Sequence, residues 1–240
     1  MEQSMIAKKK TTTRDMTTGN SAKEIMLFAL PLMFGNIFQM LYNTVDSIVV
    51  GNYVSTQALA AVGATTMIVN MAVFFFNGFS VGAGVIIGRY FGAKNMDRLH
   101  DSIETTMAAT FVFCVLFTIV GMLAVPMMLN FMSTPEDVMA DASTYLRTYF
   151  AGIAGLLIYN MGSGILRAVG DTRRPLFFLV LTSLLNIGLD LLFVLGFHLG
   201  IFGVALATIL SQFISAILTL ILLLKTNDIY KLTLHDCRID

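Results

Sequence analysis

The sequence predicts an all-α integral membrane protein, a bundle of six transmembrane helices, and three observations support this fold class. Of the 240 residues, 56% are hydrophobic and only 12% are charged, which is about half the charged share of a soluble domain. The mean hydropathy is +0.78, and the apolar residues are gathered into long blocks. Finally, the basic residues fall between alternate blocks, as they do in proteins that cross a membrane repeatedly.

Six apolar blocks reach the roughly 20 residues that a membrane-spanning helix needs. They cover residues 25–50, 58–88, 103–131, 142–166, 175–197 and 203–224. The chain therefore divides into an N-terminal tail (1–24), a six-helix transmembrane lobe (25–224) and a polar, charged segment (225–240). The blocks predict contact with a lipid bilayer, and the net charge of zero gives no reason to expect a nucleic-acid partner.

The distribution of Lys and Arg predicts the orientation of these spans. The tail holds five basic residues, the 88–102 and 166–175 loops hold three each, and the segment after residue 224 holds three. The loops at 51–57, 132–141 and 198–202 hold none, and only Arg147, early in the fourth span, departs from the pattern. By the positive-inside rule, both termini are cytoplasmic in a multi-pass protein of the cell (inner or plasma) membrane.

Two carboxylates stand out deep within the predicted spans, Asp46 late in the first and Asp190 in the fifth. A charged side chain at membrane depth costs about 2.5–3.5 kcal/mol on insertion scales, so it indicates a functional site. No Lys or Arg lies deep in a span to neutralise them. We therefore expect these carboxyl groups to hold a proton or a small cation, as in an ion-coupled transporter.

Both carboxylates belong to polar stripes at helical spacing. The members are Asn36, Gln39, Asn43 and Asp46 in the first span, Ser183, Asn186 and Asp190 in the fifth, and Thr208 in the sixth. Each stripe occupies one sector of its helix, which must face the bundle interior or water. For the amide and hydroxyl residues, interhelical hydrogen bonding worth about 0.6 kcal/mol each is an equally good interpretation. For the carboxylates, an ion site is favoured.

Pro31 interrupts the first span, where it acts either as a static bend or as a hinge. An enzyme is not predicted. Gly78–Gly82 matches G-x-S-x-G, but its Ser80 and the remote His198 belong to opposite ends of their spans. No phosphate-binding loop and no His/Cys cluster occurs, and no cofactor is expected.

Four segments together resemble the multidrug and toxic compound extrusion (MATE) family. The first span from Pro31 to Gly51 is similar to the family's first helix, and Asn186–Asp190 to its helix-five signature. Gly88–Lys94 resembles the loop after helix two, and Leu166–Pro175 the loop between helices four and five. The four occur in the family's order and cover almost the whole chain.

The resemblance implies one lobe of a MATE-type transporter of the wider MOP superfamily. Such an antiporter exports small amphipathic organic compounds, including drugs, in exchange for Na⁺ or H⁺. It implies a cation site, with Na⁺ as one candidate ion, at Asp46, Asn186, Asp190 and Thr208. It also implies a bend at Pro31 and a further polar position at Asn160. The cavity-lining candidates are Asn36, Gln39, Asn43, Asn160 and Ser183.

Two other functions remain open. A lipid-linked sugar flippase of the same superfamily would share the fold, but it would need cationic residues for a pyrophosphate headgroup. A non-transporting membrane scaffold would have no reason to keep two intramembrane carboxylates. The family's two-lobe design also predicts a partner for this lobe. Either a C-terminal six-helix lobe follows, with 225–240 as the start of a cytoplasmic linker, or a second copy pairs with the first.

Overall fold

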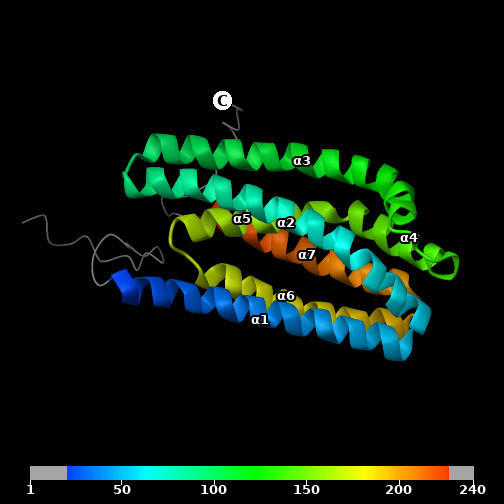
Figure 1. Cartoon of the computed structure of the whole chain (residues 1–240). Helices are drawn as coiled ribbons and strands as arrows, with labels where there is room; N and C mark the ends of the chain where they lie inside the picture. Colours follow the sequence, from blue (N-terminus) through cyan, green and yellow to red (C-terminus); the bar gives the residue numbers. More distant parts are fainter. Residues whose placement is uncertain (1–20, 227–240) are drawn as a thin grey trace, which may run out of the picture.

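The computed structural model describes residues 21–226, and this part of the chain consists of helices joined by short turns (Figure 1). The tail at 1–20 and the end of the predicted linker at 227–240 lie outside the described residues. The elements are α1 (Ser21–Tyr53), α2 (Thr56–Gly92), α3 (Met96–Phe131), α4 (Glu136–Ala151), α5 (Ile153–Ala168), α6 (Arg173–Leu191), the short π-helix η1 (Leu192–Gly196) and α7 (Gly200–Lys225).

The predicted count of six spans agrees with these helices when α4 and α5 are taken as one broken span. Five helices are long and apolar enough to cross a bilayer by themselves, and α4 and α5 form a pair bent by 50°. The predicted fourth span over 142–166 is therefore a broken span, because its helix is interrupted at Gly152. The multi-pass membrane fold itself is confirmed.

Several helices are longer than their apolar blocks. At 1.5 Å per residue, α2 and α3, with 37 and 36 residues, reach about 55 Å, well beyond the roughly 30 Å hydrocarbon core. The predicted 88–102 loop is thus mostly helical, and α4 begins at Glu136 inside the predicted 132–141 loop. Hydropathy marks the part of a helix that meets lipid, and polar turns extend it into the headgroup region.

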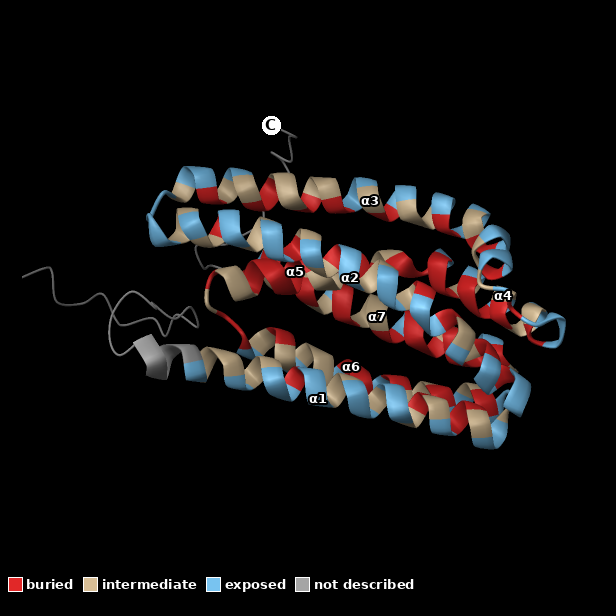
Figure 2. Ribbon diagram, in the orientation of Figure 1, coloured by how far each residue is buried: buried red, intermediate tan, exposed pale blue. Residues whose placement is uncertain are grey.

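Helix α5 is the centre of the bundle. Eleven of its 16 residues are buried, and Figure 2 shows it as the most continuously buried helix, while much of α1 and α3 is exposed. It packs against α2, α3 and α7, whereas α1 packs chiefly along α6 (Figure 1). The α1–α6 pair therefore forms one wall of the lobe.

The turn between α5 and α6 explains one of the family-like segments in structural terms. Gly170 adopts φ +85°, which only glycine adopts readily, and its N–H donates to the carbonyl of Arg167 to close α5. The buried Asp171 then accepts a hydrogen bond from the N–H of Arg174 at 3.2 Å and pairs with its guanidinium at 3.4 Å. This segment ends one helix and starts the next.

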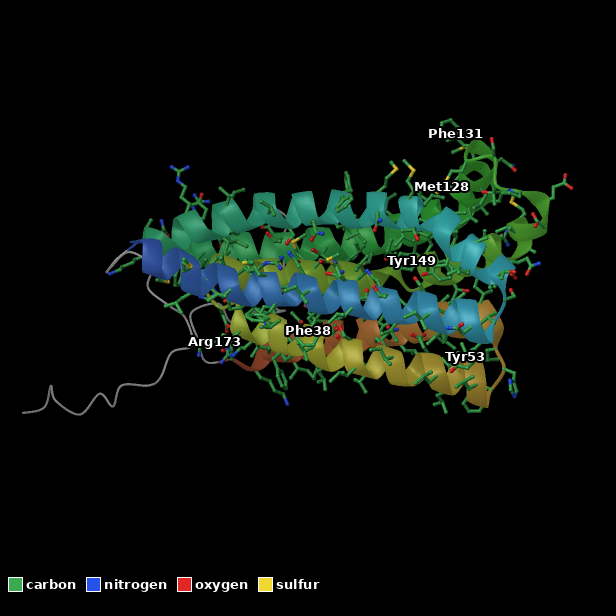
Figure 3. The ribbon with its side chains drawn as sticks, turned by 60° about the horizontal axis from the view of Figure 1, so that its bottom comes forward. Phe38, Tyr53, Met128, Phe131, Tyr149 and Arg173 are labelled. Atoms are coloured by element: carbon green, nitrogen blue, oxygen red, sulfur yellow. The ribbon has the colours of Figure 1, made fainter. Side chains whose placement is uncertain are left out.

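The helix ends define two ends of the lobe. The α2–α3 and α5–α6 turns and the end of α7 lie together and carry Lys94, Arg173 and Lys225; we call this the basic end. The α1–α2, α3–α4 and η1–α7 connections form the far end. Figure 3 shows Arg173 at the basic end, with Tyr53 and Phe131 at the far end.

Replacement of Gly155 by alanine should destabilise the bundle. A Cβ at this position would lie 2.8 Å from the backbone nitrogen of Phe213 in α7, so the two helices must separate, at a cost of about 1–3 kcal/mol. We expect Gly155→Ala to lower the thermal unfolding temperature in detergent by several degrees. The matched control is Gly188→Ala, because nothing lies within 4 Å of a Cβ there. Equal unfolding temperatures for the two variants would contradict the close α5–α7 contact.

Candidate functional site

A polar cavity of about 180 Å³ lies between the α1–α6 wall and helices α2, α5 and α7. Its lining includes six residues singled out from the sequence stripes and the resemblance: Asn36, Gln39, Asn160, Ser183, Asn186 and Thr208. Pro31 also lines it. The polar faces of four helices are thus brought to one space, which a bundle in lipid requires because hydrocarbon offers no hydrogen-bond partners.

The first-span stripe separates into two rows. Gln39 and Asp46, seven residues apart, point inward: Gln39 lines the cavity and Asp46 is buried. Asn36 and Asn43, also seven residues apart, are exposed, and only Asn36 reaches the cavity. Asn43 does not line the cavity and lies on the exposed side of α1, which we call the open edge of α1.

Asp46 and Asp190 meet behind the cavity, toward the far end. Neither carboxyl group lines the cavity itself. Asp190 is completely buried one turn beyond Asn186, and Asp46 is 8% exposed. The two side chains lie within hydrogen-bonding reach of each other. The two carboxyl groups therefore lie at a similar level of the bundle.

Several polar atoms of this pair and of the neighbouring Asn186 have no hydrogen-bond partner among the described residues. Within the described part of the chain, no hydrogen bond reaches Asp46 Oδ1, either oxygen of Asp190 or either polar atom of the Asn186 amide. Ionised carboxylates only accept hydrogen bonds, so neither can satisfy the other. Two such groups in contact cannot both carry an uncompensated charge. The arrangement can hold a shared proton, or a cation coordinated by carboxylate and amide oxygens.

Thr208 and Asn160 contribute differently. The Thr208 hydroxyl donates to the carbonyl of Val204 at 3.1 Å, which leaves its lone pairs free to face the cavity. The Asn160 amide donates to the carbonyl of Leu156 at 2.9 Å, so its oxygen remains available. Ser80, the residue of the G-x-S-x-G match, is buried and donates to the carbonyl of Asn160 at 3.0 Å, which is a structural role.

Three tyrosines near the carboxyl pair were not predicted as site residues. Tyr42 lines the cavity and Tyr145 is buried, and both lie within electrostatic range of Asp46 and Asp190. Tyr149, inside the bundle in Figure 3, stacks on Tyr145 with ring centroids 6.4 Å apart. The available signals were the spacings: Tyr145 and Tyr149 are four residues apart, as are Tyr42 and Asp46. The π-helix η1, which begins two residues after Asp190, carried no recognised sequence signal.

Comparisons with known proteins identify the family to which this fold belongs. The sequence model of the MatE family matches residues 31–192. The chain belongs to this family. It is 33% identical over 88% of its length to the probable multidrug resistance protein YpnP of Bacillus subtilis, and 33% identical over 81% to the probable multidrug resistance protein NorM of Thermotoga maritima. A crystal structure of MATE in the bent conformation superposes on 91% of the chain with a TM-score of 0.84 and 30% identity.

The MatE family assignment confirms the resemblance inferred from the four segments, and its proteins are transporters rather than enzymes. This chain spans about half the length of the relatives that it matches: 47% of YpnP, 42% of NorM and 49% of the MATE structure. One lobe of the family's fold is therefore present.

The carboxyl pair leads to a prediction about stability. In Asp190→Asn, an amide of the same shape replaces one of two facing acids and can donate to Asp46. A carboxyl group that must bind a proton in the folded protein but is ionised in the unfolded chain at pH 7 costs stability. The amide needs no proton, so we expect the unfolding temperature in detergent at pH 7 to rise by about 2–4 °C. Asp101→Asn, at an exposed position of α3, should leave it unchanged. A fall of several degrees in Asp190→Asn would show that this carboxylate is charge-compensated in the native protein.

Proposed function

We propose that this chain is the N-terminal lobe of an exporter that moves amphipathic organic compounds out of the cell in exchange for Na⁺ or H⁺. The single observation that carries the proposal is the buried contact of Asp46 with Asp190 behind a polar cavity. Two facing acids without a basic partner gain most from a proton or a cation between them. Asn186 and Thr208 would complete the oxygen ligands of such an ion.

The coupling step follows from where the carboxyl pair lies. Asp46 belongs to α1 and Asp190 to α6, so an ion held between them links the two helices of one cavity wall. When the ion leaves, repulsion between the carboxylates favours separation of α1 from α6 at this level. Pro31, on the cavity side of α1, lacks the N–H for one helical hydrogen bond. We infer that α1 bends there and that its movement changes the room available to the exported compound.

The complete transporter requires a second lobe. Alternating access in two-lobed carriers depends on two halves that move around a central site, and the chain spans about half the length of its relatives. Exposed polar residues at the open edge of α1, among them Asn36 and Asn43, support a facing partner. That partner would be a C-terminal six-helix lobe, or a second copy of this chain.

Export driven by an ion gradient is the decisive measurement. Vesicles with the complete two-lobed protein are loaded with a fluorescent cationic drug, and an inward sodium gradient and an inward proton gradient are imposed separately. We expect one gradient to drive efflux, and Asp190→Asn to reduce that efflux at least 10-fold because the ion loses a ligand. Asp101→Asn serves as the matched control.

Three outcomes would contradict parts of this proposal. Efflux at the parental rate in Asp190→Asn would show that the coupling ion does not bind at the carboxyl pair. Efflux that needs neither gradient would argue against antiport. Gradient-driven export by vesicles that contain only monomers of the 240-residue chain would show that a second lobe is unnecessary.

The orientation gives a separate prediction, with the basic end in the cytoplasm. In a background without Cys114 and Cys237, single cysteines are introduced at two exposed positions of each end. The far-end positions are Asn52 and Glu136, and the basic-end positions are Ala93 and Arg173. An impermeant maleimide applied to intact cells should label the far-end cysteines and should reach the basic-end cysteines only after permeabilisation. Labelling of only the basic-end cysteines in intact cells would show that the basic end faces outward and would contradict the predicted orientation.

A further inference from the structure

A second concave surface lies on the outside of the lobe and plays no part in the proposed export mechanism. It is a groove of about 490 Å³ between α3, α4 and α7, at the break between α4 and α5. Its lining is almost wholly apolar and includes Met122, Phe202, Leu206 and Leu210. Arg147, the one basic residue that departs from the positive-inside pattern, lies at this groove.

Helix α7 separates the groove from the polar cavity. The cavity is lined by Thr208, Ser211 and Gln212, whereas Leu206, Leu210 and Phe213 line the groove. At 100° per residue these two sets occupy opposite faces of the helix. A partner lobe that closes the polar cavity would therefore leave the groove open to lipid. Met122 and Leu210 are 41% and 38% exposed, as expected for side chains that meet acyl chains.

Arg147 lies within reach of the phospholipid headgroups at the far end. It precedes Arg167, which lies next to the basic end, by 20 residues along the α4–α5 span, a path of about 30 Å that compares with the roughly 30 Å hydrocarbon core. The 50° bend at Gly152 shortens the rise across the membrane, and the long Arg147 side chain can extend over the remaining distance to the interface. Its side chain is exposed, and it forms no ion pair with a carboxylate among residues 26–226. A guanidinium can donate two parallel hydrogen bonds to a phosphate.

We propose that this groove binds one anionic glycerophospholipid from the leaflet at the far end. An acyl chain fills the apolar groove along α7, and Arg147 holds the phosphate at its headgroup end. The anionic phosphate of such a lipid matches the positive charge of Arg147, and its hydrocarbon chain matches the apolar surface beside it. The inference rests on the membrane-spanning fold, and it does not depend on export or on the carboxyl pair.

Lipid selectivity at the groove can be measured by fluorescence, because the chain contains no tryptophan. Leu210→Trp places an indole in the groove, and the signal of the complete protein without this replacement is subtracted. The protein is reconstituted in mixtures of phosphatidylcholine and phosphatidylglycerol, with one or the other brominated on its acyl chains as a quencher. We expect phosphatidylglycerol to bind at the indole about fivefold more strongly than phosphatidylcholine, the factor typical of one interfacial basic residue.

Three variants in the Leu210→Trp background test the role of Arg147. Arg147→Gln should reduce the preference to near onefold, whereas Arg147→Lys should retain most of it. Arg173→Gln removes the same charge at the basic end and should change nothing. Phe111→Trp places a separate reporter on the exposed surface of α3, away from the groove. When Arg147→Gln is combined with this reporter, the tryptophan fluorescence and its quenching by either lipid should stay unchanged. Equal binding of the two lipids at the groove, or a preference that survives Arg147→Gln, would overturn the proposal.

Discussion

The contact between Asp46 and Asp190 is the constraint to which the rest of this lobe is arranged. Hydrocarbon offers no counter-charge, so the groups that compensate two buried acids must come from the bundle itself or from an ion. The bundle brings Asn186 and Thr208 close, together with Tyr42 and Tyr145. Among the described residues no basic side chain pairs with either acid, and Arg167, which also lines the cavity, lies next to the basic end. All of these neutral groups can bind a shared proton or a cation, but none can supply the positive charge itself. The charge of the two acids is therefore compensated only when a proton or a cation is bound.

The position of that site depends on the packing of α5. Small residues on this helix allow α2 and α7 to approach closely, as the 2.8 Å between a Cβ at Gly155 and the Phe213 nitrogen illustrates. With α2, α5 and α7 held together, α6 packs along α7 and α1 packs chiefly along α6. Asp46 therefore belongs to the outermost helix of this wall, and Asp190 belongs to the helix that joins the wall to the core. Of the two helices that carry the carboxylates, α1 has fewer neighbours to hold it in place.

The number of spans, the family and most of the residues that line the polar cavity could be predicted from the sequence. The cavity residues could be predicted for a physical reason. A membrane helix buries polar side chains only where other helices receive them, so a stripe such as Ser183, Asn186 and Asp190 indicates an interior face. The same reasoning could not separate the inner row of α1, Gln39 and Asp46, from the outer row of Asn36 and Asn43. The two rows differ by only a fraction of a helical turn, and the neighbouring helix decides which of them is covered.

The missed features share another cause. Tyr145 and Tyr149 fit an apolar span as well as any aromatic residue does, and only their neighbours give the hydroxyls a polar setting. The helix break at Gly152 was hidden because hydropathy continues across it without interruption. The polar extensions of α2, α3 and α4 were counted as loops because they lie outside the lipid. For Tyr145, the neighbours that give its hydroxyl a polar setting, Asp46 and Asp190, are distant in sequence.

Helix α4 joins the two faces of the lobe. Tyr145 and Tyr149 lie on its inner face near the carboxyl pair, while Arg147, Thr148 and Ala151 lie on its outer face at the groove. Both sets precede the break at Gly152, so they belong to one rigid segment of 16 residues. Any rotation of α4 about that break moves Tyr145 and Arg147 together. A lipid phosphate bound at Arg147 would resist such a rotation, and Tyr145 would be held near the two acids from the membrane side.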